Sequence, residues 1–267
     1  MSNQTLKAAS SKLVSQVQIA AFITLATLFS SPVHAITLVQ DRNALQSNDQ
    51  IEWSSLGKVL NPFAPSPSDF LPYSFSGQSS HGLGISVNIL PAGGDITPPF
   101  IFQNNPPVQT NFAPGDFLLF TGFSPTVIPT GNPNPLTIIF DKNVKAAGTQ
   151  IAASGSENID YEVFISAFDD ANNLLGTFSI PGISSGARDN SAVFLGVTSD
   201  TANIKSLVFN TSSPQRGFGI NKVSITTVNE PYTGVSLLIF GALGLCLKGY
   251  KFDQRKLKLG LTQIEKP

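Results

Sequence analysis

One pentapeptide of the sequence matches a nucleophile motif: Gly182-Ile183-Ser184-Ser185-Gly186 fits the G-x-S-x-G elbow of serine hydrolases. The elbow needs a strand before the serine, a helix after it, and an acid and a histidine later in the chain. A strand-like run precedes Gly182, but residues 187–190 do not begin a helical pattern and no histidine follows Ser184. The sequence therefore favours a flexible Gly/Ser loop over a hydrolase site.

Three acids close in sequence, Glu157, Asp160 and Glu162, are the residues from which a carboxylate-based hydrolase would be built. Glycoside hydrolysis needs two carboxyl groups that face each other across a groove, about 5–10 Å apart. Asp160 and Glu162 are two positions apart, so on a strand they share one face. We interpret them as a solvated acidic face and keep a secreted hydrolase as the second alternative function.

Histidine and cysteine, the usual ligands of zinc, are scarce in the segment 36–228. His81 is its only histidine, and the chain's only cysteine, Cys246, lies beyond it. Asp169-Asp170-Ala171-Asn172-Asn173 offers oxygens that suit calcium, but the EF-hand spacing is absent, and Asx residues are ordinary at a hairpin tip. The sequence therefore predicts no metal, no cofactor and no catalytic residue.

The first 35 residues have the three parts of a secretory signal peptide. Lys7 and Lys12 supply positive charge without an acid, residues 17–29 are mostly apolar, and Pro32 breaks the helix shortly before Ala35. We expect the secretion machinery to cleave after Ala35. A permanent N-terminal anchor is the alternative.

The stretch 229–258 combines a polar motif, an apolar run and a basic cluster. It begins with Asn229-Glu230-Pro231 and continues with the uncharged run Val235–Leu247. Its positive charges follow the run: Lys248, Lys251, Arg255, Lys256 and Lys258. With flanking residues, a helix here spans about 28 Å, close to the roughly 30 Å of a bilayer core. The positive-inside rule then makes 259–267 a cytoplasmic tail, and a buried core helix is the alternative.

These features resemble the PEP-CTERM sorting signal of bacterial exosortase substrates. The Glu230-Pro231 pair, the Leu and Gly residues spaced along Leu237–Leu245 and the basic end match, whereas Asn229 stands where the family usually has proline. The resemblance implies recognition by an exosortase-type membrane protease, removal of the tail, and delivery to the cell surface or extracellular matrix. It covers only 229–258 and implies nothing about the activity of the rest.

The segment 36–228 is acidic, with eight Lys and Arg against 14 Asp and Glu, a net charge of −6. The basic ends mask this in the net charge of −1 for the whole chain. Nucleic-acid binding needs clustered Lys and Arg against phosphates, so nucleic acid is excluded as a partner.

The spacing of prolines and of β-branched and aromatic residues predicts a mainly β fold. Residues 61–135 hold 14 of the 19 prolines, which excludes long helices, and leave strand-length runs at 84–90 and 117–120. Apolar residues in this region demand burial, namely Phe100, Ile101, Phe102, Phe112, Phe117 and Phe120. A short helix near Ala44 and a strand through Ile51 and Trp53 precede it.

From Leu136 onward the chain predicts an antiparallel β-sandwich of the jelly-roll type. The expected strands are 136–140, 149–153, 161–168, 174–180, 193–198, 204–210 and 218–227, with turns that include Pro181-Gly182. Residues 164–168 and 174–178 form an expected hairpin. The runs 167–178, 194–200 and 217–220 also resemble the β-sandwich cargo of other PEP-CTERM proteins. Jelly rolls of that kind often bind carbohydrate.

Besides the hydrolase alternative given above, two functions follow as hypotheses. The leading one is an exported, non-enzymatic protein of the cell surface or extracellular matrix, anchored in the membrane before processing. The first alternative is a carbohydrate-binding module, with extracellular polysaccharide as partner, which should expose Tyr73, Tyr161 or Trp53 on a face or loop rim. For Trp53, the only tryptophan, a core role is favoured over sugar stacking.

Overall fold

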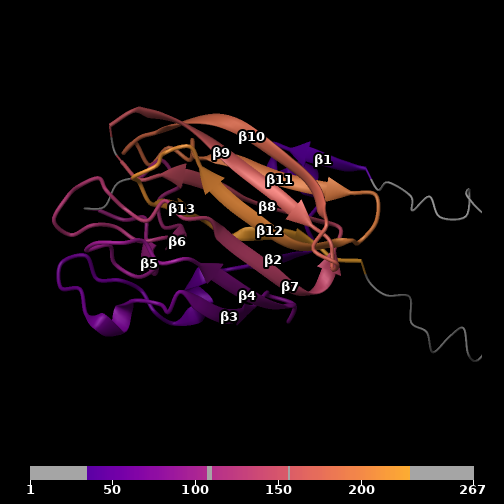
Figure 1. Cartoon of the computed structure of the whole chain (residues 1–267), viewed down its shortest axis with the longest axis horizontal. Coiled ribbons are helices and arrows are strands. Elements are labelled where there is room, and N and C mark those ends of the chain that lie inside the picture. The colour runs from indigo at the N-terminus through magenta and orange to yellow at the C-terminus, as the bar shows by residue number, and fades with distance from the viewer. Residues whose placement is uncertain (1–34, 107–109, 156, 229–267) are drawn as a thin grey trace, which may run out of the picture. The chain divides into compact units, whose positions relative to one another are not determined.

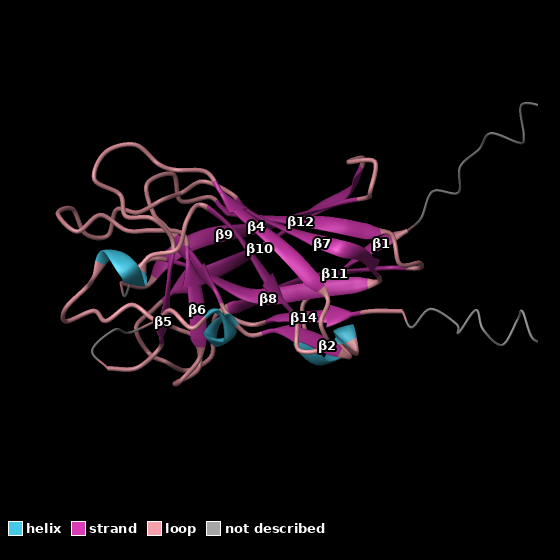
Figure 2. Ribbon diagram, turned by 90° about the horizontal axis from the view of Figure 1, so that it is seen from below, coloured by secondary structure: helices cyan, strands magenta, loops and turns pink. Residues whose placement is uncertain are grey.

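The computed structural model describes residues 35–106, 110–155 and 157–228, which form two β-sheets (Figure 1). Every pairing between named strands is antiparallel. The helices in this part are short 3-10 turns, η2 (Arg42–Leu45), η3 (Trp53–Leu56) and η4 (Pro67–Asp69), which lie in loops outside the strands (Figure 2). None of them is long and apolar enough to cross a membrane. The predicted mainly β class is confirmed.

The eight-stranded sheet contains both ends of the described chain. Its main path, in spatial order, is β1 (Ile36–Val39), β11 (Val193–Ser199), β8 (Ala146–Ala153), β13 (Phe218–Ile220), β6 (Phe117–Phe120) and β5 (Phe100–Gln103). β14 (Val223–Thr226) also pairs with β8, and its other neighbour is β2 (Asp49–Ile51). Because β13 and β14 pair with opposite ends of β8, they lie one after the other along the same neighbour.

The six-stranded sheet forms the second layer. Its spatial order is β10 (Leu174–Ser184), β9 (Ile159–Phe168), β12 (Ile204–Thr211), β7 (Leu136–Val144), β4 (Gly84–Ile89) and β3 (Ser74–Gln78). Burial alternates along β9, where Tyr161, Val163 and Ile165 are buried and the residues between them are partly exposed. One face of this sheet therefore packs inward and the other meets solvent.

The core lies between the two sheets, as a β-sandwich requires. One hydrophobic cluster joins residues such as Ile165 and Phe209 of the six-stranded sheet with Ile151, Leu195 and Phe218 of the eight-stranded sheet. The expected burial of the phenylalanines in the proline-rich region is confirmed for four and only partial for one. The buried ones are Phe100, Phe102, Phe112 and Phe120, and the partly buried one is Phe117.

Two predicted boundaries are wrong for local reasons. Pro181-Gly182 is not a turn, because β10 continues through it to Ser184 with Pro181 opposite Glu162. β10 is an edge strand, where the N–H that proline lacks is not needed on the outer side. The run 218–227 is two strands, β13 and β14, separated at Asn221 and Lys222. The hairpin of β9 and β10 is confirmed, with Phe168 opposite Leu174.

Both chain ends of the sandwich lie at the same end of β8. Ala146, the first residue of β8, pairs with Thr198 and Thr226, and Thr198 pairs with Thr37. β8 has eight residues and reaches roughly 23 Å away from that point before it ends at Ala153. The far end of β8 is where the cavity described next opens.

Candidate functional site

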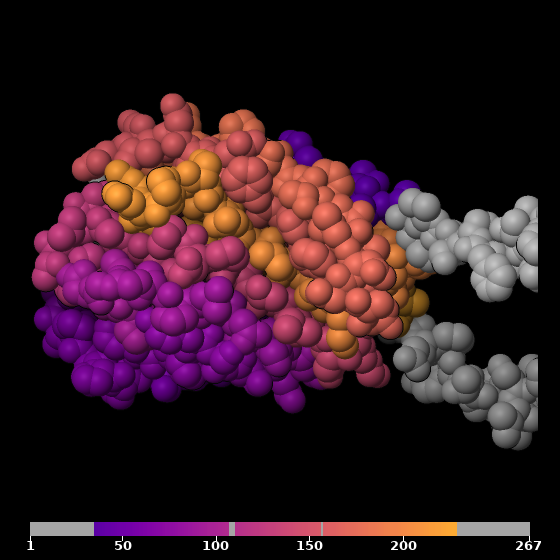
Figure 3. Space-filling model, in the orientation of Figure 1, coloured from indigo at the N-terminus to yellow at the C-terminus, as the bar shows by residue number. Residues whose placement is uncertain are grey.

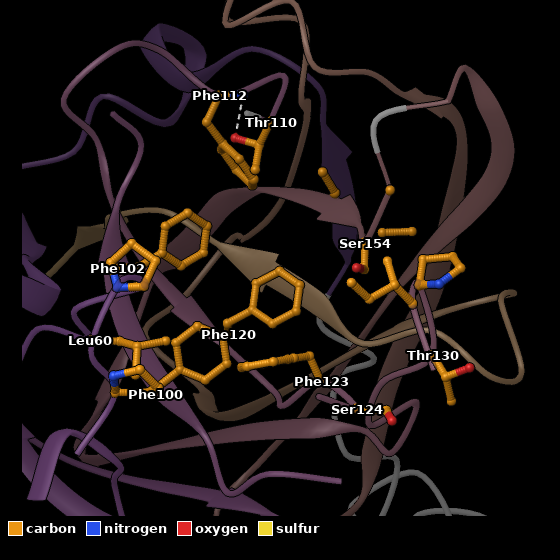
Figure 4. A pocket seen from close by; sticks show the side chains of 17 residues that line it. Leu60, Phe100, Phe102, Thr110, Phe112, Phe120, Phe123, Ser124, Thr130 and Ser154 are labelled. Atoms are coloured by element: carbon orange, nitrogen blue, oxygen red, sulfur yellow. Dashed lines mark hydrogen bonds between the residues drawn. The ribbon is translucent and has the colours of Figure 1, made fainter. Parts of the chain in front are cut away.

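A cavity of about 390 Å³ lies at the end of the sandwich where β8 finishes (Figure 4). Its lining comes from three strands and from four loops between residues 60 and 155. The lining residues are Leu60, Pro62, Pro65, Phe100, Phe102, Thr110, Phe112, Phe120, Phe123, Ser124, Ile128, Pro129, Thr130, Ala152, Ala153, Ser154 and Gly155. This volume falls within the range of small-molecule sites.

One cross-strand row forms the floor of the cavity. Phe100 pairs with Phe120, Phe120 with Gly219, and Gly219 with Ala152. The Cβ of any larger residue at 219 would lie 2.9 Å from a ring carbon of Phe120, so the ring keeps its position only above glycine. In this row two phenylalanines are followed by Gly219 and Ala152, and these small residues leave a hollow over β13 and β8.

Aromatic rings build the apolar wall. The ring centroid of Phe100 lies 5.4 Å from those of both Phe120 and Phe123, and the Phe123 contact is edge-to-face. The ring centroids of Phe102 and Phe120 are 5.8 Å apart. Rings at these separations attract one another beyond the burial of their area, so the wall is held in shape.

The loops that cover the cavity are tied to the strands by hydrogen bonds. The Leu60 amide donates to the Ile101 carbonyl at 2.7 Å, and the Asn104 side-chain amide donates to the Phe112 carbonyl at 2.8 Å. The lining also includes one exposed apolar side chain, Ile128, which is 84% exposed.

The polar groups of the lining are neutral hydroxyls on Thr110, Ser124, Thr130 and Ser154. Charged residues lie just outside the lining, among them Arg188, whose amide donates to the Thr110 carbonyl at 2.9 Å. Arg216 Nη1 donates to the Ser154 carbonyl at 2.9 Å. Asp95 accepts a hydrogen bond from Ser124 Oγ at 3.0 Å and another from Thr126, and these two bonds lower the pKa of Asp95 below its usual value.

The serine of the G-x-S-x-G match does not stand at a strand-to-helix turn. Ser184 is buried at the end of β10, and its Oγ lies 3.5 Å from the Ile159 carbonyl oxygen. Residues 185–192, all described, contain no helix. Ser184 therefore acts as a packed strand residue.

The predicted carboxylates lie where the strand period puts them. Asp160 and Glu162 share the outer face of β9, and Glu162 Oε1 accepts a hydrogen bond from Ser179 Oγ at 2.5 Å. At the tip of the β9–β10 hairpin, the Asn173 amide donates to Asp169 Oδ1 at 2.7 Å, which is turn chemistry as predicted. Across the described ranges, no group of three His, Cys, Asp or Glu could hold a metal ion.

His81 has an exposed side chain, and its Nδ1 lies 3.4 Å from the buried carboxylate of Asp49. Asp49 accepts hydrogen bonds from the Gln50 amide at 2.8 Å, from the His81 amide at 3.0 Å and from the Ser79 hydroxyl. The carboxylate therefore organises the turn before β4.

Two of the three aromatic residues considered for sugar stacking are in the core. Trp53 is 1% exposed, which confirms its predicted core role, although it begins η3 and does not continue a strand. Tyr161 is also buried, which corrects the expectation that it could lie on a binding rim. Its hydroxyl donates to the Ile151 carbonyl at 3.2 Å, and burial raises the pKa of Tyr161 to about 12. Tyr73 is half-buried before β3.

The sorting and anchoring residues lie outside the described residues. These are Asn229, Glu230, Pro231, Lys248, Lys251, Arg255, Lys256 and Lys258. Ala35, the expected cleavage position, is the first described residue and is exposed.

Sequence reasoning did not find the cavity. Its only local signal is the pair Phe100 and Phe102, which the strand period places on one face, together with prolines in the neighbouring loops.

No protein-family model matches the chain, and no curated protein matches it. Among solved structures, a DUF4465 family protein from Bacteroides caccae ATCC 43185 is 13% identical, with a TM-score of 0.35, over 72% of this chain and 100% of that one. CsCBM6-3 from Clostridium stercorarium, solved with cellobiose, is 12% identical, with a TM-score of 0.25, over 50% of this chain and 89% of that one. The enzymatically active domain of tailspike protein 4 from bacteriophage CBA120 is 13% identical, with a TM-score of 0.29, over 54% of this chain and 19% of that one. Likenesses this weak support no conclusion about what the chain binds.

Proposed function

We propose that this protein is an exported, non-enzymatic protein of the cell surface or extracellular matrix, whose jelly-roll-like sandwich binds a small ligand in the cavity beside Phe120. The observation that carries the proposal is the lining itself. It is rich in phenylalanine and contains no Asp, Glu, His, Lys, Arg or Cys among its 17 residues. Acid–base and nucleophilic catalysis normally require such groups in contact with the ligand, whereas binding does not.

The sequence positions of the first and last strands support the export and sorting part of the proposal. β1 begins at Ile36, directly after the expected cleavage at Ala35, and β14 ends at Thr226, shortly before Asn229. The folded unit thus fits between the two processing positions. Its partners in transit are the secretion machinery, the membrane and an exosortase-type protease.

The place of the cavity also supports a surface role. Ile36 and Thr226 lie at one end of β8, and the cavity opens at the other. The cavity is therefore at the end of β8 away from the first and last strands of the sandwich.

Peptide mapping tests the sorting part. Protein recovered outside the cell should lack Leu237 to Lys258. Peptides from Lys248 to Lys256 in the extracellular fraction would instead indicate a retained anchor.

Binding of N-phenylnaphthylamine, an uncharged dye that fluoresces in apolar surroundings, tests the cavity. The purified full-length chain should bind it saturably. Ala152→Leu, which fills the floor, and Ile128→Ser, at an exposed rim position that folding tolerates, should each weaken binding. The apolar chain ends are common to all variants, so differences between variants report on the cavity alone. Unchanged binding in both variants would reject the cavity as the site.

Polysaccharide binding is a second candidate, favoured by the solvent face of the six-stranded sheet. A cross-strand row there presents hydroxyl and amide side chains around a single valine: Ser74, Asn88, Thr137, Val208, Ser166 and Thr177. A glycan array without a binder would remove this candidate. The hydrolase alternative gains no support, since Asp160 and Glu162 lie along one strand and do not face each other across a groove.

A further inference from the structure

We propose that the cavity takes a small single-chain amphiphile, with its apolar chain among the phenylalanines and a carboxylate head held by Arg216. This inference rests on the cavity being the binding site, as proposed above. It goes further by naming the chemical class of the ligand and the residue that recognises its head.

The interior suits an unbranched apolar chain. A volume of 390 Å³ corresponds to about a dozen water-sized groups, because a water in the liquid occupies about 30 Å³. Phe100, Phe120 and Phe123 surround this space with ring surfaces and no charge. Burying a chain there yields about 0.8 kcal/mol per CH₂ group.

Backbone hydrogen bonds place Arg216 at the rim, between two lining segments. The Gly131 amide, next to Thr130, donates to the Gln215 carbonyl at 2.8 Å, and the Ser154 amide donates to the Gly217 carbonyl at 2.7 Å. The guanidinium then lies over the end of β8, where Nη1 binds the Ser154 carbonyl at 2.9 Å. A Cβ at Gly155 would lie 2.5 Å from Nη1, so glycine at this position gives the guanidinium room.

The charge of Arg216 has no acidic partner in the described part of the chain. The one ion pair found within 4.0 Å there joins His81 and Asp49. Arg216 is half-buried, and its side-chain hydrogen bond is to the Ser154 carbonyl, which leaves most of its five donors available. A planar guanidinium with free donors matches a carboxylate in bidentate geometry.

Arg216 sets the direction of the ligand. Its guanidinium is bound at Ser154, so the head belongs there and the chain runs toward Phe100. Asp95 does not compete for Arg216, because its carboxylate already accepts bonds from the hydroxyls of Ser124 and Thr126.

Displacement of N-phenylnaphthylamine at neutral pH tests this assignment with three probes of equal chain length: decanoate, decanol and decyltrimethylammonium. The full-length chain should prefer decanoate to decanol by about tenfold, the scale of one charged hydrogen bond. Arg216→Gln should abolish this preference without changing decanol binding. Lys205→Gln, which removes an exposed positive charge elsewhere, and Asp95→Asn should both retain it.

The outcomes separate the two proposals. If Ala152→Leu and Ile128→Ser leave dye binding unchanged, the cavity is not the site and both proposals fail. If they weaken it but decanoate is no better than decanol, or Arg216→Gln keeps the preference, only the head assignment fails. Tighter binding of decyltrimethylammonium than of decanoate would also overturn the assignment of a carboxylate head to Arg216.

Discussion

The indole N–H of Trp53 donates a hydrogen bond of 2.8 Å to the backbone carbonyl of Asn221, although 168 positions separate the two residues. Asn221 lies between β13 and β14, and its side chain is also fully engaged. It donates to Gln150 Oε1 at 2.6 Å and to Asp116 Oδ2 at 3.0 Å, and it accepts from Arg42 Nη2 at 2.8 Å. The network explains why an apparently continuous run becomes two strands.

Replacing Asn221 should destabilise the sandwich strongly. Asn221→Ala leaves the buried backbone amide and Oε1 of Gln150 without this partner, at about 1–3 kcal/mol each, so we expect a loss of roughly 3 kcal/mol. Urea unfolding followed by the fluorescence of Trp53, the single tryptophan, measures it. Asn210→Ala, on the solvent face of β12, is the control and should change stability by about 0.5 kcal/mol or less. Equal effects of the two substitutions would contradict the role of Asn221.

Gly219→Ala should disturb the floor of the cavity. The added methyl group would press on the Phe120 ring, which costs about 1–3 kcal/mol of stability and moves the ring into the cavity. Dye affinity should fall together with stability. Gly93→Ala, where an added Cβ meets nothing within 4 Å, should leave both unchanged. An unaltered dye affinity in folded Gly219→Ala would show that the floor is placed incorrectly.

Asp49 should matter for stability, and its exposed neighbour His81 should not. Asp49→Ala removes the acceptor of the Ser79 hydroxyl and the His81 amide, with an expected loss of about 2–3 kcal/mol because the acceptor is charged. His81→Gln should stay within about 0.5 kcal/mol, since an exposed ion pair contributes little. Urea midpoints compare the two. A larger loss from His81→Gln would refute this account.

Stability should fall steeply in alkali through Tyr161. Burial raises its pKa to about 12 in the folded state, against about 10 in an unfolded chain. Between these values the unfolded chain has lost a proton that the folded chain keeps, so unfolding becomes easier as pH rises. The contribution is complete below about pH 10 and disappears through about pH 12.

The matched variants isolate this effect. Tyr161→Phe should lose about 1 kcal/mol at neutral pH, from the bond to the Ile151 carbonyl, but should show a shallower decline between pH 10 and 12. Tyr73→Phe, at a half-buried position, should follow the wild-type curve. Parallel curves for Tyr161→Phe and wild type would exclude Tyr161 as the titrating group.

Strand pattern alone located most of the fold. Strand-length runs of β-branched and aromatic residues predicted β6, β9, β11 and β12 to within two residues at each end, since the composition of a short run is a local property. Short or edge strands such as β1, β3 and β5 were missed, because few residues carry their pattern. The strand through Pro181 was misjudged because the sequence does not say which strand is at an edge.

Which residues line the cavity and which form the Asn221 network is decided by the register in which the strands pair. The row from Phe100 to Ala152 is made of residues from four strands, and no spacing in the sequence connects them. Figure 3 shows the same mixing on the surface, where late residues in orange adjoin residues from the middle of the chain. Tyr161, unlike Trp53, had no predicted core role, and packing decided that it is buried.

The sequence by itself determined the mainly β class and the acidic, thiol-free middle, because composition acts without partners, and it predicts sorting signals at both ends. The tertiary structure decided which side chains meet: Phe120 above Gly219, Arg216 over Ser154, and Trp53 against Asn221. The reason is physical. Alternation fixes which face a side chain takes, whereas its neighbours across the sheet depend on the pairing of segments far apart in the chain.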